Sequence, residues 1–321
     1  MEENLYDVVV IGGGPAGLTA GIYTSRALLK TLVISSAIQP PQAVLTDIIE
    51  NYPGFPSGIN GFDFVENLKE QAEKFGCKII TDHVLKIEKK EKIFVVYLSN
   101  GEIDSKSLVV ASGRRSKKLG LPKEDLLVGK GISYCAVCDA GFYKDKTVAV
   151  IGGGDTAFTE AIYLTKFVKK LYLVHRRNQF RATKILQKRL LEKDNVEILT
   201  PFVVEKILTK IDENNREIVS GIVIKNVEIQ GIKEINCDGV FVCIGYQPNT
   251  EFLRDSTSCT VILDTEGYVV TDENFKTSVD GIYACGDCRS GSIKQVICAC
   301  GEGARAGLSV VDFLEKIIFS L

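Results

Sequence analysis

The sequence predicts an α/β protein built from two similar units, one inserted into the other, and two observations support this. A pattern of buried strand, glycine-rich loop, helix and second strand occurs twice, starting at Tyr6 and again at Thr147. An apolar strand that ends in glycine follows each pattern further along the chain, over 108–113 and 240–245. Such units are typical of Rossmann-like nucleotide-binding domains. Two copies in this context are much stronger evidence than one glycine motif alone.

The chain is long enough for two domains and carries almost no net charge. Its 321 residues are 45% hydrophobic, and 39 Lys and Arg nearly balance 41 Asp and Glu. Binding to nucleic acid or to an anionic membrane usually needs a basic excess, so we expect neither partner. No apolar run approaches the roughly 18 residues of a membrane span, and Met1-Glu2-Glu3 does not begin a secretory leader. We therefore expect a cytoplasmic protein.

The first unit begins with the strand Tyr6–Ile11, followed by a glycine loop, a helix over 18–28 and the strand Thr31–Ile34. The glycines allow a tight turn and a close approach of the backbone to a pyrophosphate, which the helix N-terminus attracts. Ser35 stands at the end of the second strand, where an acidic residue commonly holds a ribose. The candidate dinucleotide contacts are Gly12, Gly14, Pro15, Ala16, Gly17 and Ser35.

The second unit repeats this order with the strand Thr147–Ile151, a glycine loop, a helix over 158–166 and the strand Leu171–Val174. Basic residues follow that last strand, and a guanidinium cluster at this place can pair with the 2′-phosphate of NADPH. The alternative is a solvated basic patch, because Lys169, Lys170 and Arg189 lie in the same region. The candidate NADPH contacts are Gly152, Gly154, Asp155, Thr156, Ala157, His175, Arg176, Arg177 and Arg181.

The remainder of the first unit is expected at the end of the chain. There the sequence shows a strand-like segment over 267–270, the run Cys285-Gly286-Asp287 and helical apolar spacing over 301–314. We predict a discontinuous FAD-binding domain, 1–116 with 246–321, and an inserted NADPH-binding domain, 117–245. Gly286 and Asp287 are candidate contacts of the ribityl–pyrophosphate chain of FAD. The alternative is that Asp287 only caps a following helix.

The pair Cys135 and Cys138 forms a CxxC motif directly before the second glycine loop. At a turn or helix start this spacing favours a reactive thiolate, and Asp139 could donate or accept a proton. A zinc site would need further ligands such as Cys285 and Cys288, so we favour a redox pair and expect no metal. The other cysteines are expected to be buried and structural, with a second dithiol as the minority interpretation for four of them: Cys285, Cys288, Cys298 and Cys300.

Along nearly its whole length, the sequence resembles the low-molecular-weight thioredoxin reductase family. The resemblance rests on Gly12–Gly17, Glu50–Gly54, Cys135–Asp139, Gly152–Ala157, His175-Arg176-Arg177 with Phe180-Arg181-Ala182, and Gly286-Asp287 followed by Gln295. The end of the chain, Lys294–Ile297 and Gly301–Ala304, is more similar to the related alkyl hydroperoxide reductase flavoprotein subunit.

This resemblance implies a homodimer in which NADPH reduces FAD, FAD reduces the Cys135–Cys138 disulfide, and the dithiol reduces thioredoxin or a thioredoxin-like protein. By similarity Cys138 faces the flavin, Cys135 attacks the acceptor disulfide and Asp139 handles protons. Pro40-Pro41 and Ala140 depart from the family pattern. The resemblance also implies further FAD contacts from Gln42, Thr46, Asn51, Gly113, Gln295 and Val296.

Other function classes remain open at this point. A ferredoxin- or flavodoxin-NADP reductase on the same fold lacks the CxxC pair. A related disulfide reductase could use ferredoxin or NADH as its electron donor, or a peroxiredoxin-system or glutaredoxin-like protein as its acceptor. The candidate NADPH contacts Arg176, Arg177 and Arg181 count against ferredoxin as the donor. A non-enzyme alternative is a zinc-stabilised regulator with Cys135, Cys138, Cys285 and Cys288 as ligands. Glutathione-reductase-type enzymes are excluded, because the first cysteine is Cys77 and no histidine follows His175.

Overall fold

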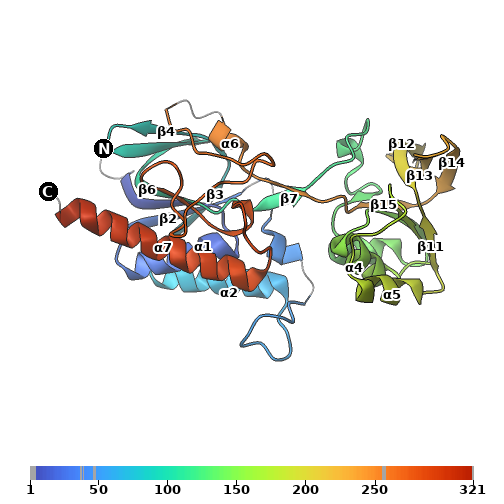
Figure 1. Cartoon of the computed structure of the whole chain (residues 1–321), viewed down its shortest axis with the longest axis horizontal. Coiled ribbons are helices and arrows are strands. Elements are labelled where there is room, and N and C mark those ends of the chain that lie inside the picture. The colour runs from blue at the N-terminus through green and yellow to red at the C-terminus, as the bar shows by residue number, and fades with distance from the viewer. Residues whose placement is uncertain (1–4, 37, 39, 46–47, 255–257, 320–321) are drawn as a thin grey trace. The chain divides into compact units, whose positions relative to one another are not determined.

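The computed structural model describes residues 5–36, 38, 40–45, 48–254 and 258–319 and contains two compact units (Figure 1). The first unit joins Met1–Arg115 to Gln247–Leu321, and the second is the intervening segment Ser116–Tyr246. The chain passes between them twice, through the short strands β7 (Arg114–Ser116) and β16 (Tyr246–Pro248), which pair with one another. None of the described helices combines the length and the apolar character needed to cross a membrane.

The first unit is built on a seven-stranded sheet in the order β3-β2-β1-β6-β5-β4, with β17 also pairing β6. The strands β1, β2, β3, β6 and β17 pair in parallel. Strand β5 pairs antiparallel with both of its neighbours, β6 and β4. The bounds are β1 Leu5–Ile11, β2 Thr31–Ser36, β3 Lys78–Asp82, β4 Val84–Lys90, β5 Ile93–Leu98, β6 Gly101–Val110 and β17 Ile282–Ala284. Its helices are α1 Pro15–Arg26, α2 Gly61–Lys74, α6 Glu251–Arg254 and α7 Val296–Phe319, with 3₁₀ turns η1 Gln42–Leu45 and η4 Gly286–Cys288.

The second unit has a five-stranded parallel sheet in the order β11-β10-β9-β15-β8 and a three-stranded antiparallel sheet, β12-β13-β14. The bounds are β8 Ile132–Ser133, β9 Thr147–Ile151, β10 Lys170–Val174, β11 Val196–Leu199, β12 Phe202–Ile211, β13 Glu217–Asn226, β14 Ile232–Asn236 and β15 Gly239–Val242. Its helices are α3 Ala136–Asp139, α4 Asp155–Leu164 and α5 Lys184–Leu191, with 3₁₀ turns η2 Asp125–Leu127 and η3 Ala140–Tyr143.

Each central sheet is buried on both faces, which explains why its strands are continuous apolar runs in the sequence. On β1, Val8 and Val10 pack toward α1 and α7, whereas Val9 packs on the opposite face. On β9, Val148 and Val150 likewise face the core that includes α4. The predicted α/β fold class is confirmed. In both units the glycine loop therefore emerges from a strand held rigidly in the middle of a sheet.

Local differences from the sequence prediction have physical reasons. Helix α1 begins at Pro15 rather than at residue 18, because proline at the first helical position needs no hydrogen-bond partner for its nitrogen. The segment 267–270 forms only isolated bridges instead of the expected strand. Asp264 Oδ1 accepts hydrogen bonds from the backbone N–H groups of Glu266 and Tyr268, so this stretch begins as a tight turn.

Helices α1 and α7 lie side by side in the first unit and are brought together by glycine (Figure 1). A Cβ on Gly303 would collide with the Ala16 carbonyl oxygen, whereas a Cβ on Gly301 of the same helix would have no neighbour within 4 Å. We expect Gly303→Ala to lower the free energy of unfolding by about 1–3 kcal/mol. The matched change Gly301→Ala should leave it unchanged or raise it by up to about 1 kcal/mol. Urea unfolding of the two variants checks this, and equal midpoints would contradict it.

Candidate active site

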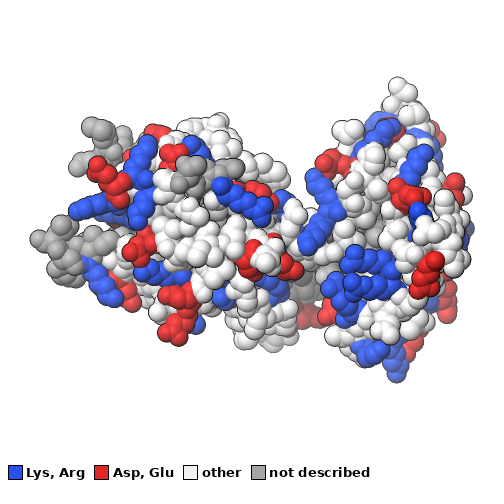
Figure 2. Space-filling view, turned by 45° about the horizontal axis from the view of Figure 1, so that its top comes forward, with Lys and Arg blue, Asp and Glu red and all other residues white. Residues whose placement is uncertain are grey.

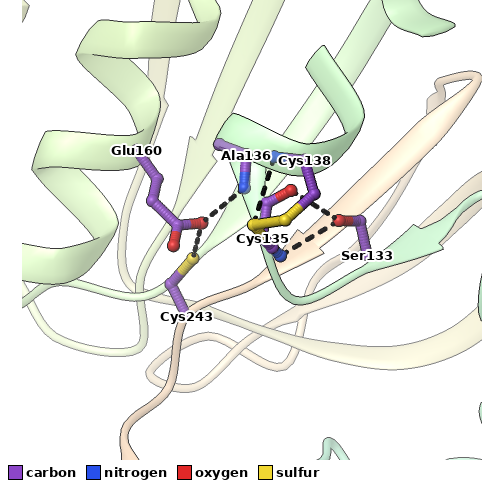
Figure 3. The surroundings of a disulfide bond; sticks show 6 residues. All are labelled: Ser133, Cys135, Ala136, Cys138, Glu160 and Cys243. Atoms are coloured by element: carbon purple, nitrogen blue, oxygen red, sulfur yellow. Dashed lines mark hydrogen bonds between the residues drawn. A yellow bond between two sulfur atoms is a disulfide. The ribbon is translucent and has the colours of Figure 1, made fainter. Parts of the chain in front are cut away.

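The two cysteines of the CxxC motif are joined by a disulfide at the start of a short helix in the second unit (Figure 3). Cys135 is the N-cap of α3, and the backbone N–H of Cys138 donates to its Sγ over 3.1 Å. The Ser133 hydroxyl accepts from the Cys135 N–H at 3.1 Å and donates to its carbonyl at 3.2 Å. Cys138 is exposed and Cys135 is half-buried. The disulfide is therefore held by backbone contacts and, within its unit, open to solvent on the Cys138 side.

The helix that carries the disulfide is only one turn long, so its position depends on packing. Ala136, the first residue of this helix, is fully buried, and Ala140, which follows the helix, is 1% exposed. The chain continues into η3, where the ring of Tyr143 packs edge-on against the ring of Phe241 of β15, with 5.2 Å between the ring centroids. The alanine at 140 is accommodated because its methyl group lies in this core.

Asp139 ends α3 and is half-buried. Its backbone N–H donates to the Cys135 carbonyl at 3.3 Å, which closes the turn around the disulfide. Although Asp139 is also the N-cap of η3, its carboxylate makes no cap hydrogen bond. The carboxylate is therefore not used to cap the turn that follows it.

A second carboxylate near the disulfide was not predicted from the sequence. Glu160 of α4 accepts a hydrogen bond from the backbone N–H of Ala136 at 3.4 Å and from the Cys243 thiol at 3.1 Å (Figure 3). Burial raises the pKa of Glu160, and burial together with this carboxylate raises the pKa of the Cys243 thiol well above its usual value. One signal was available: Glu160 shares the apolar face of its helix with the buried Ala157, Ala161 and Leu164.

The second glycine loop is folded tightly onto its surroundings yet leaves a helix N-terminus uncapped. A Cβ on Gly152 would collide with the Cys243 carbonyl, and one on Gly153 would collide with the His175 ring. Gly154 is the N-cap of α4 and supplies no side-chain cap, and the space beside it is open. An uncapped helix N-terminus next to a close-packed glycine backbone suits a phosphate group.

The predicted arginine cluster is attached to this same loop. The backbone N–H of Arg181 donates to the Gly153 carbonyl at 2.8 Å, while the side chains of Arg176, Arg177 and Arg181 are exposed. Figure 2 shows basic side chains gathered on the visible face of this unit. His175 is buried, and desolvation, with a smaller contribution from the arginines, lowers its pKa, so its ring is neutral at pH 7. The geometry thus leaves the three guanidinium groups available to an anion beside the loop.

In the first unit, the first glycine loop has the same construction. Gly12 adopts φ +125°, and a Cβ there would collide with the Ala111 carbonyl at the end of β6. Gly14 is the N-cap of α1, which has no side-chain cap and no acidic residue in its first turn. Ser35 lies against Gly13, where an added Cβ would be 2.6 Å from the hydroxyl oxygen. This loop therefore also fits a pyrophosphate at a helix N-terminus.

Residues from the end of the chain complete the first unit. Asp287 forms an ion pair with Arg114 at 2.9 Å, and burial raises the pKa of its carboxyl. Its carboxylate is therefore engaged by a basic residue of the same unit. Glu302 of α7 accepts from the Gly286 N–H at 2.8 Å and pairs with Arg289 at 2.7 Å, which fixes η4.

The other predicted FAD contacts are placed in the same unit. The Asn51 amide donates to the Gln295 side chain at 2.9 Å, directly before α7 begins at Val296. Gly113 has φ +65° with open space around it. Gln42 begins η1, whose Val44 N–H donates to the carbonyl of Pro41, so the two prolines precede a regular turn. Thr46 lies outside the described residues.

Comparison with known proteins agrees with this geometry. The family model of the pyridine nucleotide-disulphide oxidoreductases matches residues 6–303. The chain belongs to this family. It is 40% identical over 314 residues to thioredoxin reductase of Helicobacter pylori (strain J99) and 38% identical over 315 residues to that of Treponema pallidum (strain Nichols). These alignments cover 97% and 98% of this chain, respectively, and 99% of each relative.

Solved structures of the family show the same fold. Thioredoxin reductase from Lactococcus lactis superimposes with a TM-score of 0.86 at 34% identity, covering 97% of this chain and 99% of the other. The enzyme from T. acidophilum gives a TM-score of 0.84 at 30% identity, with coverage of 98% and 100%. A ferredoxin-flavin thioredoxin reductase from Clostridium acetobutylicum gives 0.51 at 29% identity, with coverage of 97% and 99%.

The remaining cysteines of this pyridine nucleotide-disulphide oxidoreductase are reduced thiols, nearly all buried. Cys285 and Cys288 are fully buried, and the Cys288 thiol donates to the carbonyls of Cys285 and Val110. Burial raises the pKa of both thiols, which disfavours a thiolate. Cys298 differs in being half-buried. Among the described residues no group of three or more His, Cys, Asp or Glu side chains is placed to hold a metal ion.

Proposed function

We propose that this chain is an NADPH-dependent flavoprotein that reduces the disulfide of thioredoxin or a thioredoxin-like protein. The observation that carries the proposal is the Cys135–Cys138 disulfide, placed in the same unit as an uncapped glycine loop and an exposed arginine cluster. The relatives that match this chain from end to end are thioredoxin reductases. The arginines favour NADPH over NADH or ferredoxin, because neither of those carries a 2′-phosphate.

In this proposal the two glycine loops hold two different dinucleotides. The loop of the first unit, with Ser35, Asn51, Gly113, Gly286, Asp287 and Gln295, would hold FAD, and the loop of the second unit would hold NADPH. Support comes from the two uncapped helix N-termini and from glycines whose Cβ atoms would collide with neighbouring backbone or ring atoms. The chemistry that FAD supplies when bound is two-electron transfer between NADPH and the disulfide.

The residues of the redox helix would then act in sequence. Two electrons break the bond between Cys135 and Cys138 and leave a dithiol. The Cys135 thiolate attacks the acceptor disulfide and forms a mixed disulfide, which Cys138 resolves, so that the acceptor leaves with two reduced sulfurs. Asp139 handles protons beside the pair.

We also propose that the protein is a cytoplasmic homodimer; light scattering in solution should give the mass of two chains.

An anaerobic titration tests the proposed function directly. Adding NADPH to the purified flavoprotein should bleach the flavin absorbance band, and adding oxidised thioredoxin should restore it. Bleaching without recovery would exclude thioredoxin as the acceptor. A flavin that NADPH does not bleach would contradict the assignment of the arginine cluster and require another donor.

A further inference from the structure

Glu160 occupies a position that the reaction outlined above does not use. Its carboxylate lies between the first residue of the redox helix and Cys243, which directly follows β15 (Figure 3). Ala136, whose N–H it accepts, is the residue directly after Cys135. A half-buried carboxylate this near a dithiol interacts with any thiolate that forms there, because like charges in a poorly solvated region repel one another.

Cys243 makes this carboxylate suited to holding a proton. Because the pKa of the Cys243 thiol is raised well above its usual value, the thiol stays protonated and remains a hydrogen-bond donor at neutral pH. The Glu160 carboxyl has a pKa raised by burial, so it takes up a proton more readily than an exposed glutamate. Of the pair, Glu160 is therefore the group better suited to gain or lose a proton, because the Cys243 thiol stays protonated.

The other charged groups around Glu160 do not replace it in this role. The redox helix α3 contributes Asp139, and α5, which packs on α4, carries Lys184, Lys188 and Arg189. On β10, Lys170 pairs with Glu197 at 2.7 Å. Burial raises the pKa of Glu160, and the hydrogen bonds from the Cys243 thiol and the Ala136 N–H lower it. The proton affinity of Glu160 therefore depends on groups that lie directly beside the disulfide.

We propose that Glu160 takes up one of the two protons that accompany reduction of the Cys135–Cys138 disulfide. This rests on the proposed function, which supplies the two electrons. When the S–S bond breaks, one sulfur becomes a thiol with a proton from solvent and the other remains a thiolate. The second proton goes to the Glu160 carboxylate, which compensates the new negative charge. When the dithiol reduces an acceptor disulfide, both protons leave with the two acceptor sulfurs.

Glu160 is a positioning residue in this proposal, because its carboxylate contacts are to Ala136 and Cys243 rather than to the two reacting sulfurs. The expected signature is a change in proton stoichiometry. At pH values above the pKa of the sulfur that remains a thiolate, the wild-type protein should take up two protons per disulfide reduced. Glu160→Gln keeps a hydrogen-bond acceptor of the same shape but cannot be protonated, so it should take up one.

The test equilibrates the purified full-length protein in glutathione redox buffers at a series of pH values on both sides of neutrality. The reduced fraction of Cys135 and Cys138 is measured by alkylation and mass spectrometry. Glutathione disulfide itself takes up two protons on reduction at pH values below the pKa of the glutathione thiol, so for wild type the equilibrium constant for reduction by glutathione should not change with pH. For Glu160→Gln, which takes up one proton, this constant should increase about tenfold per pH unit, equivalent to ~30 mV. Glu192→Gln, which removes an exposed carboxylate of the same unit, should behave as wild type.

Equal pH slopes for wild type and Glu160→Gln would overturn the proposal. If that variant does not fold, infrared difference spectra of the wild-type protein replace it: reduction should produce the band of a protonated carboxyl group, and its absence would overturn the proposal. Neither measurement involves NADPH or thioredoxin. A failure here is therefore distinguishable from a failure of the proposed function, which the flavin titration tests.

Discussion

Replacing Cys138 by serine is expected to abolish thioredoxin reduction while leaving reduction of the flavin by NADPH intact. Cys138 is the exposed partner of the disulfide, and the remaining thiol of Cys135 cannot accept two electrons by bond cleavage. Turnover with oxidised thioredoxin should fall at least about a thousandfold, because without Cys138 the redox disulfide cannot form and a mixed disulfide on Cys135 cannot be resolved. Stopped-flow absorbance separates the two half-reactions: the flavin band should bleach with NADPH and stay bleached when thioredoxin is added.

The matched control is Cys259→Ala. Cys259 is a buried thiol that packs in the core of the first unit, away from the glycine loops. This change also removes one sulfur, so it reports any general effect of losing a thiol. Its turnover should remain close to that of the wild type. If Cys138→Ser reduced thioredoxin at the wild-type rate, the redox pair would have to lie elsewhere in the chain.

The double variant Arg176→Ala/Arg177→Ala is expected to lose the preference for NADPH over NADH. Both guanidinium groups are exposed next to the loop that ends at Gly154, where a 2′-phosphate can reach them. A hydrogen bond to a charged group contributes about 1.5–3 kcal/mol. Losing two should therefore lower kcat/KM for NADPH by about 100-fold or more, since each 1.4 kcal/mol is about tenfold. The value for NADH should change little.

Arg189→Ala provides the comparison for this prediction. Arg189 is an exposed basic residue in the last turn of α5, in the same unit but further along the chain from the glycine loop. If the region acted only as a solvated basic patch, the two variants would lower kcat/KM for NADPH to a similar, small extent. A large loss confined to the double variant would show that the position of the arginines, rather than their charge alone, determines the preference.

The fold could be predicted from the sequence because its signals are local. A buried parallel strand is a continuous apolar run, and glycines that must approach other backbone cannot be replaced, so the two loops at Gly12 and Gly152 stand out. The CxxC pair was also recognisable from spacing alone. Its placement at the start of a helix, with Cys135 as the N-cap, agrees with the prediction.

The partners of the site residues could not be predicted, because they depend on contacts distant in sequence. Glu160 approaches Ala136 and Cys243 only because α3, α4 and β15 pack together. Asp287 was expected next to a cofactor, and its ion pair with Arg114 joins residues that are far apart in the sequence, on either side of the second unit. The composition of the segment 267–270 predicts a strand, but the turn that Asp264 organises extends into its first residues.

The discontinuity of the first unit has a consequence for how the protein is made. All residues of Ser116–Tyr246 leave the ribosome before β17 and α7 do, so this segment can fold while the first unit still lacks a strand and a helix. Until α7 emerges, the face of α1 around Ala16 and Ala20 has no partner. At a synthesis rate of about 5–20 residues per second, this lasts on the order of ten seconds or more. The apolar face of α1 that α7 covers in the finished unit therefore stays exposed throughout that interval.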